Sequence, residues 1–482
     1  MTERHGPSGG AAGGLATGLD LRMLAREGPV HFMGISGAGM SALAELVLRG
    51  GGRVTGCDAR PGAVGEALRA LGAEVVQGHD PAHVEGAVAV VATAAIPADH
   101  PELVAARRRG IPVLKRAEAL GALVNRGQVV AVAGTHGKTT TTAMTTAILV
   151  EAGLDPTGFV GGQVPGWGGG LRRGSDRLFV VEADEYDRSF LTLRPTVAVV
   201  TTIEADHLDI YGTLEAIEAA FCEFLQPVPD GGLIAACVDD PGVRRILGKL
   251  GGKPVLGYGL GAEASLRAVE VEVQGRGSRF VVEERGERLG ELVLAVPGLH
   301  NVRNALGAFA AARHVGTDFE AARRALEGFR GVARRFQELG RARDVVVVDD
   351  YAHHPTEIEA TLAAARAAYP DRRLVAVFQP HLYTRTRDFA EEFGRVLASA
   401  DVVWVTDVYP AREAPIPGVT GELVARSAEA AGAAEVHYHP SVSDLAAALA
   451  AYLRPGDLCL AMGAGDITEA AAEVLARLSA EK

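Results

Sequence analysis

The chain has 482 residues, of which 48% are hydrophobic, 22% are charged and 5% are aromatic. That length suits roughly two to four domains, and the apolar content excludes a disordered chain. A formal net charge of −12 argues against a protein that coats nucleic acid or an anionic membrane. The four cysteines form no CxxC pair, so we expect neither a disulfide framework nor a zinc site, and we expect a reducing, cytoplasmic location. No apolar run approaches the ~20 residues that span a bilayer, so we expect no membrane insertion.

Residues 1–19 are rich in glycine and lack the apolar stretch of a signal peptide, so we predict a flexible tail. Strand-like and helix-like runs then alternate in three blocks, which predicts an α/β protein with mainly parallel sheets. We place these blocks at residues 20–125, 126–330 and 331–482. We predict a Rossmann-like first domain, a P-loop-type mononucleotide-binding central domain and a Rossmann-like third domain. Alternating apolar residues at 266–296 predict antiparallel strands at an edge of the central sheet.

The first block opens with the strand-like run PVHFMGI, followed by a glycine-rich turn. Gly34, Gly37 and Gly39 stand in this turn. Asp58 ends the next strand, near the offset of an acid that binds a ribose hydroxyl. Ser36 stands where a dinucleotide-binding fingerprint has its middle glycine, which weakens the case for NAD but not for phosphate. The turn therefore predicts phosphate binding, although glycines that only allow helix–strand packing would give the same pattern.

The second block contains the loop GTHGKT (Gly134–Thr139) between a strand-like run and a helix-like run. A strict P-loop reads GxxxxGK[ST], and Val132 occupies its first glycine position, so this loop is a shorter variant. Backbone N–H groups at the start of the helix would point at phosphate. Lys138 would neutralise the β and γ oxygens, and Thr139 would offer its hydroxyl to Mg²⁺. The alternative is a glycine-rich turn that carries a surface lysine.

Acidic residues and a histidine follow the next two strand-like runs of this block. Strand ends of this kind are where α/β sheets bind ligands, and carboxylates beside a nucleotide suggest magnesium ligands. Two solvated loop ends would be the alternative. The first group comprises Glu182, Asp184, Glu185 and Asp187, and the second comprises Glu204, Asp206, His207 and Asp209.

The third block has similar polar groups after two of its strand-like runs. Cationic and imidazole side chains there suit the recognition of carboxylate and phosphate, and arginine offers a bidentate geometry. Any one of these side chains alone would ordinarily be a solvated surface residue. The residues are Asp349, Asp350, Tyr351, His353 and His354 in VVVVDDYAHHPTEI, His381, Arg385 and Arg387 in VFQPHLYTRTRDF, and the pair Arg334–Arg335 before them.

Taken in order, these motifs resemble those of the Mur ligase family. The set runs HFMGISGAGMSALAE, GTHGKTTTTAM, VEADEYDRSFL, TTIEADHLDIYG, PGLHNVRNAL, ARRFQELG, DDYAHHPTEI, QPHLYTRTRDF and GAGD, and it covers nearly the whole chain after the tail. The resemblance implies three domains that bind, in turn, the UDP part of a sugar substrate, ATP and an amino acid.

The same resemblance implies an ATP-dependent ligase of peptidoglycan precursor synthesis. The lactyl carboxylate of UDP-N-acetylmuramate would be activated as an acyl phosphate and then joined to L-alanine, with release of ADP and phosphate. The implied cofactors are ATP and Mg²⁺, or Mn²⁺ in its place. The implied assembly is a monomer or a weak homodimer, with no nucleic acid partner.

The resemblance also assigns site residues in four sets. The UDP-sugar set comprises Gly34, Ser36, Gly37, Ala38, Gly39, Asp58 and His79. The ATP set comprises Gly134, Thr135, His136, Gly137, Lys138, Thr139, Thr140, His300, Asn301, Asn304, Arg335 and Asp350. The pocket for amino acid and carboxylate comprises Tyr351, His353, His381 and Arg385. The metal set comprises Thr139, Glu182 and His207, and the residues expected in catalysis are Lys138, Glu182, His207, His353 and Arg385.

This sequence departs from the family pattern at two places. Many relatives carry a carbamoylated lysine on the helix after the DH motif, whereas GTLEAIEAAFCEFLQ contains no lysine. Glu218 is our candidate substitute. Leu382 stands where some relatives have an arginine, which leaves Arg385 and Arg387 to bind the anion.

Four other interpretations stay open. A P-loop GTPase or motor is the first. The sequence has no NKxD guanine-binding motif, and this interpretation would leave the two flanking α/β blocks unexplained. An NAD oxidoreductase would bind nicotinamide near Gly34–Gly39, and a nucleotide sensor would bind without turnover. A recycling ligase that attaches a whole tripeptide to the same sugar would share the fold and most motifs, but IEADHLDIYG and RRFQELG favour the alanine-adding activity.

Overall fold

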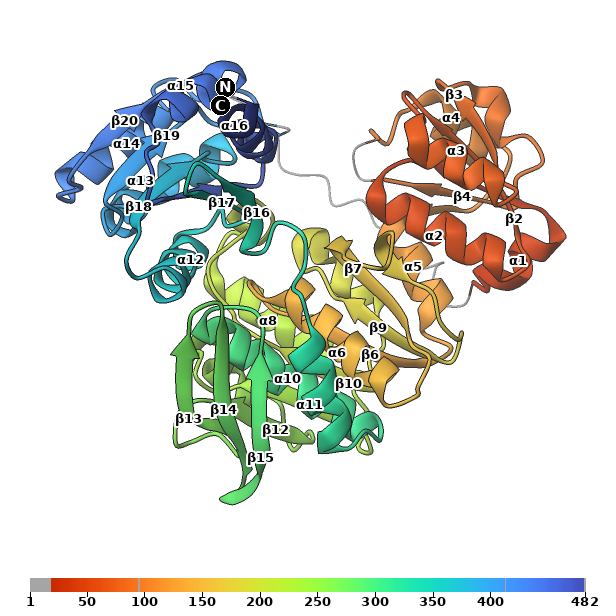
Figure 1. Cartoon of the computed structure of the whole chain (residues 1–482). Helices are drawn as coiled ribbons and strands as arrows, with labels where there is room; N and C mark the ends of the chain where they lie inside the picture. The colour runs from red at the N-terminus through yellow and green to blue at the C-terminus, as the bar shows by residue number, and fades with distance from the viewer. Residues whose placement is uncertain (1–18, 94–95, 412, 481–482) are drawn as a thin grey trace, which may run out of the picture.

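The computed structural model describes residues 19–93, 96–411 and 413–480, which fold into three α/β units on three separate sheets (Figure 1). The sheets are mainly parallel, which confirms the predicted fold class. Each sheet lies within one of the three predicted blocks, and the boundaries between the blocks stay a prediction. The predicted tail falls almost wholly on residues 1–18, outside the described residues.

The first unit is a five-stranded parallel sheet of order β3-β2-β1-β4-β5. The order reverses direction beside β1, and such a switch point is where open α/β sheets bind ligands. The glycine-rich turn lies at this point because it directly follows β1. The elements are α1 (Leu21–Glu27), β1 (Pro29–Met33), α2 (Ala38–Arg49), β2 (Arg53–Asp58), α3 (Gly62–Ala70), β3 (Glu74–Gln77), η1 (Pro81–Val84), β4 (Ala89–Ala92), α4 (Pro101–Arg108), β5 (Val113–Lys115) and α5 (Arg116–Val124).

The central unit is a ten-stranded sheet of order β15-β14-β13-β12-β11-β10-β6-β9-β7-β8. Strands β13, β14 and β15 pair antiparallel at one edge, which confirms the expectation for residues 266–296. The elements are β6 (Gln128–Ala133), α6 (Lys138–Glu151), β7 (Thr157–Val164), β8 (Gly169–Arg172), β9 (Leu178–Glu182), η2 (Tyr186–Thr192), β10 (Val197–Val200), α7 (Leu208–Tyr211), α8 (Leu214–Leu225), β11 (Leu233–Cys237), α9 (Pro241–Leu247), β12 (Val255–Gly259), β13 (Leu266–Gln274), β14 (Gly277–Glu284), β15 (Glu287–Leu294), α10 (Leu299–Val315) and α11 (Phe319–Gly328).

Helix α6 begins at the end of the phosphate-type loop and contains six threonines, all of them buried. Threonine is a weak helix former, and a buried hydroxyl needs a partner. Thr142, Thr145 and Thr146 each donate to the backbone carbonyl four residues earlier at 2.8 Å. This back-bonding lets a polar run pass through the core of the central unit.

The third unit is a six-stranded sheet of order β16-β17-β21-β18-β19-β20, in which only the pair β16–β17 is antiparallel. Its two polar groups follow β17 and β18, the two neighbours of β21. The elements are β16 (Gln337–Ala342), β17 (Val345–Asp350), α12 (Pro355–Ala368), β18 (Arg373–Phe378), α13 (Tyr383–Leu397), β19 (Val402–Val405), α14 (Gly421–Ala430), β20 (Val436–Tyr438), α15 (Val442–Tyr452), β21 (Asp457–Met462) and α16 (Ile467–Ala480).

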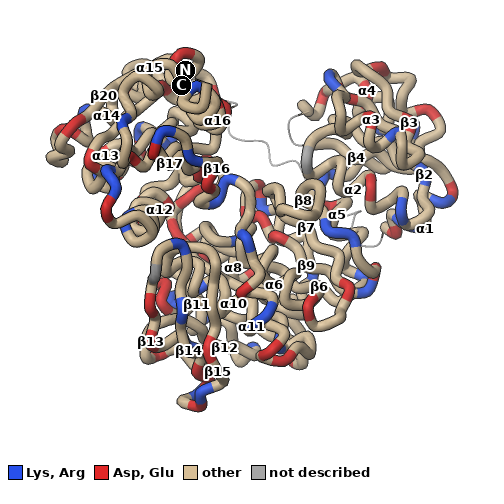
Figure 2. Tube along the Cα trace, in the orientation of Figure 1, with Lys and Arg blue, Asp and Glu red and all other residues tan. Residues whose placement is uncertain are grey.

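The first and third units stand at separate corners of the central unit, and α12 is the helix of the third unit that faces it (Figure 1). Acidic and basic residues are interspersed over all three units in the view of Figure 2. Among the described residues, no helix has both the length and the apolar character needed to cross a membrane.

Candidate active site

The loop between β6 and α6 has the backbone that a phosphate-binding turn requires. Gly134 and Gly137 both have positive φ angles, of 139° and 82°. A Cβ atom at Gly134 would overlap Thr201, and one at Gly137 would overlap Asn304, so a side chain fits at neither position. The Thr135 N–H also donates to the carbonyl of Thr202 at 2.9 Å, which ties the loop to the end of β10.

Lys138 is the first residue of α6, and its Nζ is held by the acidic segment after β9. The ammonium donates to both carboxylate oxygens of Glu185, at 2.8 and 2.9 Å, and to the Gly134 carbonyl at 2.7 Å. Burial works against the charge, but the neighbouring carboxylates of Glu185 and Asp184 outweigh it and raise the pKa of Lys138. The cation is therefore fixed at the loop, charged at every pH at which the protein works.

The three predicted metal ligands are only partly brought together. Thr139 Oγ1 donates to Glu182 Oε1 at 2.8 Å, and the Gly161 N–H donates to Glu182 Oε2 at 2.6 Å. His207 instead lies 3.7 Å from Glu185 and 3.8 Å from Asp206. Its pKa is lowered, first by burial and then by Lys138 and Arg385, although Asp206 works against the change. Thr139 and Glu182 thus form a pair of hard oxygen donors, whereas His207 lies beside Glu185, the partner of Lys138.

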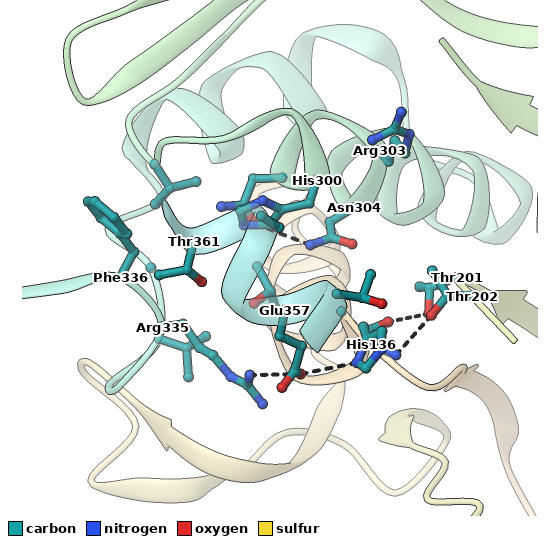
Figure 3. A pocket seen from close by; sticks show the side chains of 18 of the residues that line it. His136, Thr201, Thr202, His300, Arg303, Asn304, Arg335, Phe336, Glu357 and Thr361 are labelled. Atoms are coloured by element: carbon teal, nitrogen blue, oxygen red, sulfur yellow. Dashed lines mark hydrogen bonds and ion pairs between the residues drawn. The ribbon is translucent and has the colours of Figure 1, made fainter. Parts of the chain in front are cut away.

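The third unit reaches the loop through the first turn of α12. His136 lies 3.2 Å from Glu357 of α12 and 3.3 Å from Glu204, as Figure 3 shows for the Glu357 contact. Burial disfavours the imidazolium, but these two carboxylates outweigh it and raise the pKa of His136 to about 9. Thr356 Oγ1 also donates to Glu204 at 2.7 Å. A protonated His136 therefore joins the loop of the central unit to the third unit.

A cavity of about 230 Å³ opens beside this contact and is lined by both units (Figure 3). Tyr258, Val296, Val332 and Phe336 give it an apolar wall, and most of the other lining residues are polar. The part of the predicted ATP set that lines it comprises His136, Gly137, Thr140, His300, Asn301, Asn304, Arg335 and Asp350. The other four members, Gly134, Thr135, Lys138 and Thr139, belong to the adjoining loop and helix start.

Hydrogen bonds fix the polar groups of this cavity. Asn304 Nδ2 donates to Asn301 Oδ1 at 3.1 Å, and Asn301 Nδ2 donates to the Pro297 carbonyl at 2.7 Å. The carboxylate of Asp350 accepts from the N–H groups of Phe336 and Ala352, both at 2.7 Å. Burial raises the pKa of Asp350 to about 6, against the opposing effect of Arg335.

His300 also lines the cavity, on the turn that starts α10. Burial, with help from Arg303 and Arg335, lowers its pKa to about 4. At neutral pH its ring is therefore uncharged, so it offers a neutral hydrogen-bonding edge and a flat apolar face to a ligand.

The predicted pocket for amino acid and carboxylate is a row of aromatic rings that ends at an ion pair. The rings of Tyr351 and His353 are 5.2 Å apart, and those of His353 and His381 are 5.8 Å apart. Arg385 lies 2.5 Å from Asp206 of the central unit, with side chains only 5% and 10% exposed. This guanidinium holds the pKa of Asp206 well below its usual range, despite burial. Burial lowers the pKa of His381 to about 3, so this ring is neutral.

The glycine-rich turn of the first unit is organised by Asp58. Its carboxylate accepts hydrogen bonds from the N–H groups of Ser36, at 3.1 Å, and Arg60, at 2.9 Å. Asp58 therefore fixes the conformation of the turn from its position at the end of β2. Gly34 has a φ of 73°, and Gly37 caps α2. Ala38 begins α2, and its side chain lies outside what the structure describes.

The sequence does not reveal the site roles of Glu357 and Arg116, and it shows Glu185 only as one of several acids. Glu357 gives no sequence signal because its partner His136 is in another unit. Arg116 is the first residue of α5, and its guanidinium lies over the glycine-rich turn. A Cβ atom added to Gly39 would be only about 3.1 Å from this guanidinium. The basic pair at the end of β5, Lys115 and Arg116, was the signal that could have found it.

Two expectations about charged residues need correction. Both carboxylate oxygens of Glu218 accept hydrogen bonds, from Arg245 of α9 at 2.5 Å and from Lys249 just after that helix at 3.0 Å, so neither oxygen is left without a partner for a metal ion. Arg387 is 53% exposed and pairs with its neighbour Asp388 at 2.7 Å, so only Arg385 remains as a buried candidate for anion binding.

Comparison with known proteins gives a match along nearly the whole chain. Three family descriptions match in order: Mur ligase family, catalytic domain at residues 29–128, Mur ligase middle domain at 132–312, and Mur ligase, glutamate ligase domain at 334–465. A UDP-N-acetylmuramate–L-alanine ligase of Salinibacter ruber is 48% identical, over 93% of this chain and 94% of its own length. One from Acidothermus cellulolyticus is also 48% identical, over 92% and 93% of the two chains.

Solved structures agree with this match. A UDP-N-acetylmuramate–alanine ligase of Thermotoga maritima aligns with a TM-score of 0.79 at 30% identity, covering 94% of this chain and 100% of that one. A murein peptide ligase of Psychrobacter arcticus aligns with a TM-score of 0.69 at 26% identity, covering 94% and 99%. Sequence, fold and the ordered arrangement of the loop, the acidic strand ends and the third unit all agree: the chain belongs to the Mur ligase family.

Proposed function

We propose that this chain is an ATP-dependent ligase that joins L-alanine to the lactyl carboxylate of UDP-N-acetylmuramate. The observation that carries the proposal is the cavity beside the Gly134–Thr139 loop, which is completed by residues of the third unit. The relatives at 45–48% identity that bear this activity in their names support the choice of substrates.

The cavity suits the base and ribose of ATP, and the loop suits its phosphates. The apolar wall of Tyr258, Val332 and Phe336 would pack on a purine. The fixed side-chain amides of Asn301 and Asn304 would orient the purine by hydrogen bonding. From there the phosphates would run along the start of α6, where free N–H groups and Lys138 offset their charge. Phosphate oxygens would share the Nζ of Lys138 with Glu185.

The donors near the loop fit a hard divalent cation such as Mg²⁺. Thr139 and Glu182 offer a hydroxyl and a carboxylate in contact, and Mg²⁺ takes one or two such protein ligands together with phosphates and water. We propose these two as its protein ligands, with His207 nearby. The bound ion would neutralise charge that develops on the transferred phosphoryl group.

The proposed chemistry has two steps. A lactyl carboxylate oxygen attacks the γ-phosphorus of ATP, the bond to the β-phosphate oxygen breaks, and ADP and an acyl phosphate result. The amine of L-alanine then attacks the acyl carbon, phosphate leaves with the electrons of the C–O bond, and the nitrogen loses a proton. Lys138 offsets the repulsion between the two anions in the first step. His353 and Arg385 lie at the end of the third unit that would receive the amino acid.

The buried Arg385 is our candidate for the substrate carboxylate. Asp206 takes one of its N–H groups, and a guanidinium has five, so donors remain for a second anion. Closure of the third unit on the loop would keep water from the acyl phosphate. The polar groups that meet across the two units, His136, Glu204 and Glu357, support such a closure.

In the first unit, the UDP-sugar would bind at the turn that follows β1. Gly34, Ser36 and Gly37 expose backbone there, and Arg116 stands over it with a charge that suits a diphosphate. We propose Arg116 as an addition to the set that the resemblance implies. We also propose that the chain acts in the cytoplasm, as a monomer or weak homodimer. Its four free cysteines suit a reducing compartment.

The test is the release of phosphate from ATP with Mg²⁺ and UDP-N-acetylmuramate, with L-alanine, glycine, L-serine or the tripeptide added one at a time. We expect release that requires the sugar nucleotide and is fastest with L-alanine. Release only with the tripeptide would make the chain a recycling ligase. Release that ignores both additions would refute the ligase proposal in favour of a nucleotide switch.

A pair of lysine variants tests the role of the loop. Lys138→Met should lower kcat/KM by at least about 10³-fold, because an electrostatic contact to the transferred group is lost in a water-poor site. Lys249→Met removes a lysine that is 55% exposed just after α9, and it should leave the rate within about twofold. Equal rates for the two variants would contradict the placement of ATP.

A further inference from the structure

The first unit holds a cluster of metal-type side chains, of which only the half-exposed His79 belongs to a set that the resemblance assigns, that for the UDP-sugar. Cys57 is the next-to-last residue of β2, His79 follows β3, and Glu102 is in the first turn of α4. Cys57 Sγ is 3.3 Å from His79 Nδ1 and 3.4 Å from Glu102 Oε2, and His79 Nδ1 is 3.2 Å from Glu102 Oε2. Three donor atoms from three elements thus form a nearly equilateral triangle.

The size of this triangle matches a face of a tetrahedral metal site. With Zn–S near 2.3 Å and Zn–N and Zn–O near 2.0–2.2 Å, neighbouring ligand atoms are separated by roughly 3.3–3.7 Å. The distances between Cys57, His79 and Glu102 are 3.2–3.4 Å, so two lie at the short end of that range and the third is just below it. A thiol, an imidazole and a carboxylate are also the donor types that Zn²⁺ takes together.

His31 supplies a fourth donor from the middle of β1. One of its ring nitrogens, one carboxylate oxygen of Glu102 and the Cys57 sulfur all lie within 4.8 Å of one another. His31 Nδ1 bonds with Thr55 at 2.9 Å, whereas Nε2 is buried without a hydrogen-bond partner. An orphaned buried nitrogen costs stability unless something binds it.

Glu102 poses a related problem of charge. Its side chain is fully buried, and its described contacts are the Cys57 thiol, the imidazoles of His79 and His83, and the N–H of Asp80. None of these groups carries a permanent positive charge, and a buried carboxylate is costly without one. A divalent cation would supply that charge. It would also release the proton of Cys57, whose thiol pKa is otherwise raised by burial and by Glu102 itself.

We propose that this cluster binds a thiolate-preferring divalent cation of the Zn²⁺ class through Cys57 Sγ, His79 Nδ1, Glu102 Oε2 and His31 Nε2. His83 Nδ1 and the Asp80 N–H both contact Glu102 Oε1, at 2.9 Å, and so orient the carboxylate as partners of metal ligands do. Met33, Val84 and Leu103 give the site an apolar surround. The His79 side chain is 30% exposed and gives the ion a way in from solvent.

This proposal revises the expectation that the chain lacks a zinc site. That expectation rested on cysteine spacing, and here a single cysteine is combined with two histidines and a glutamate from distant parts of the sequence. The ion would tie β1, β2, the end of β3 and α4 together beside the glycine-rich turn. The ligands are outside the nucleotide cavity, and only His79 is shared with the set that the resemblance assigns to the UDP-sugar.

The test uses Co²⁺ as a spectroscopic probe of the full-length protein. After treatment with a chelator and its removal, Co²⁺ is titrated in the presence of excess Mg²⁺, which occupies hard oxygen sites. We expect a thiolate-to-Co²⁺ charge-transfer band that saturates at about one equivalent and is abolished by added Zn²⁺. Absence of the band in the wild-type protein would overturn the proposal.

Matched cysteine variants assign the band to a site. Cys57→Ser should abolish it and weaken binding by more than about tenfold. Cys237→Ser removes the cysteine that lines the nucleotide cavity and should leave the band intact. A band that survives Cys57→Ser, or that is lost in Cys237→Ser, would place the ion elsewhere and refute the site.

A second variant covers the case in which Cys57→Ser does not fold, as judged by circular dichroism. Glu102→Gln keeps the shape and the hydrogen-bonding capacity of the side chain but removes its charge. It should keep the charge-transfer band and weaken Co²⁺ binding by more than about tenfold. Unchanged affinity in Glu102→Gln would overturn the assignment of Glu102 as a ligand and, with it, the proposed site.

Discussion

The two outer units are joined to the central unit in different ways. The joint of the first unit is apolar: one continuous core cluster contains Leu120 and Leu123 of α5 together with Phe190 and Leu193 of the central unit. The ion pairs around it are at the surface, and the one between Lys115 and Asp187 has side chains 65% and 38% exposed. This joint resembles the interior of a single domain.

The joint of the third unit is polar and charged. Among the described residues, its apolar clusters contain no residue of the central unit. The contacts across the joint include the Arg385–Asp206 pair, the contact of His136 with Glu357 and the hydrogen bond from Thr356 to Glu204.

The difference indicates which unit moves. Burial of apolar surface gives a joint that is stable without a ligand, whereas polar joints resemble transient interfaces and open readily. The cavity for ATP lies in the polar joint, so ligand binding and closure there are coupled. The first unit would serve as a fixed platform for the UDP-sugar.

The largest effect should come from the buried ion pair of the polar joint. Arg385→Ala leaves the buried Asp206 without its arginine partner, which costs about 3–5 kcal/mol. We expect kcat/KM for ligation to fall by about 10²- to 10⁴-fold, since closure would carry that cost. The measurement is steady-state phosphate release.

Arg387→Ala is the matched control, because Arg387 is exposed two residues away and pairs only with its neighbour Asp388. It should retain the wild-type rate. The double variant Arg385→Ala/Asp206→Asn should lose less than the sum of the two single losses, as coupled residues do. Strict additivity would show that the two side chains act separately. The Arg385–Asp206 pair would then not be the main contact of the polar joint.

A core residue of the apolar joint should affect stability instead of rate. Leu123 is fully buried in the shared cluster. Leu123→Ala should lower the free energy of unfolding in urea by about 2–5 kcal/mol, through lost burial and the cavity left behind. Activity at low temperature should stay within about threefold of wild type.

Leu71→Ala serves as its control, because Leu71 is 37% exposed after α3. Its effect should stay within about 0.5 kcal/mol. A Leu123→Ala variant as stable as wild type would show that the first unit does not share its core with the central unit.

The contrast between the joints also separates what the sequence could predict from what it could not. The phosphate-type loop was predictable because Gly134, Gly137 and Lys138 are close in sequence and their roles depend on local backbone. The antiparallel edge at β13–β15 was predictable from the alternation of side chains. Strands β7 and β8 gave no such signal, because glycines in this stretch leave few side chains to alternate.

The roles that the sequence did not reveal depend on contacts between residues far apart in the chain. Glu357 meets His136 only after two units dock, and no spacing in the sequence records that contact. Arg116 lies over Gly39 because α5 packs beside the glycine-rich turn. Glu218 was predicted near the metal, but the sequence does not show that α9 brings Arg245 and Lys249 to it.

The polar joint should weaken as pH rises. His136 has its pKa raised to about 9 from an ordinary 6.5, so its stabilising effect is complete below about pH 6.5 and is lost as pH rises through 9. Glu357→Gln removes its main carboxylate partner. We expect wild type to bind ATP about 10- to 100-fold more tightly than this variant at pH 6.5, which corresponds to a charged hydrogen bond of about 1.5–3 kcal/mol.

The measurement is the ratio of the two ATP dissociation constants between pH 6.5 and 10, so that the titration of ATP itself cancels. The ratio should approach one above pH 9. A ratio that stays constant to pH 10 would show that His136 does not titrate in this range and that the joint does not depend on its charge.

The smallest effect should come from the exposed ion pair beside the apolar joint. Lys115→Ala removes its contact with Asp187, and exposed pairs contribute about 0–1 kcal/mol. A double-mutant cycle with Asp187→Asn, read from urea unfolding, should give a coupling within that range that vanishes near 1 M salt, where the Debye length is about 3 Å. A coupling that is larger and survives salt would mean that charge, and not the shared apolar core, holds the first unit in place. The two joints would then differ in exposure alone, and the first unit would be as free to move as the third.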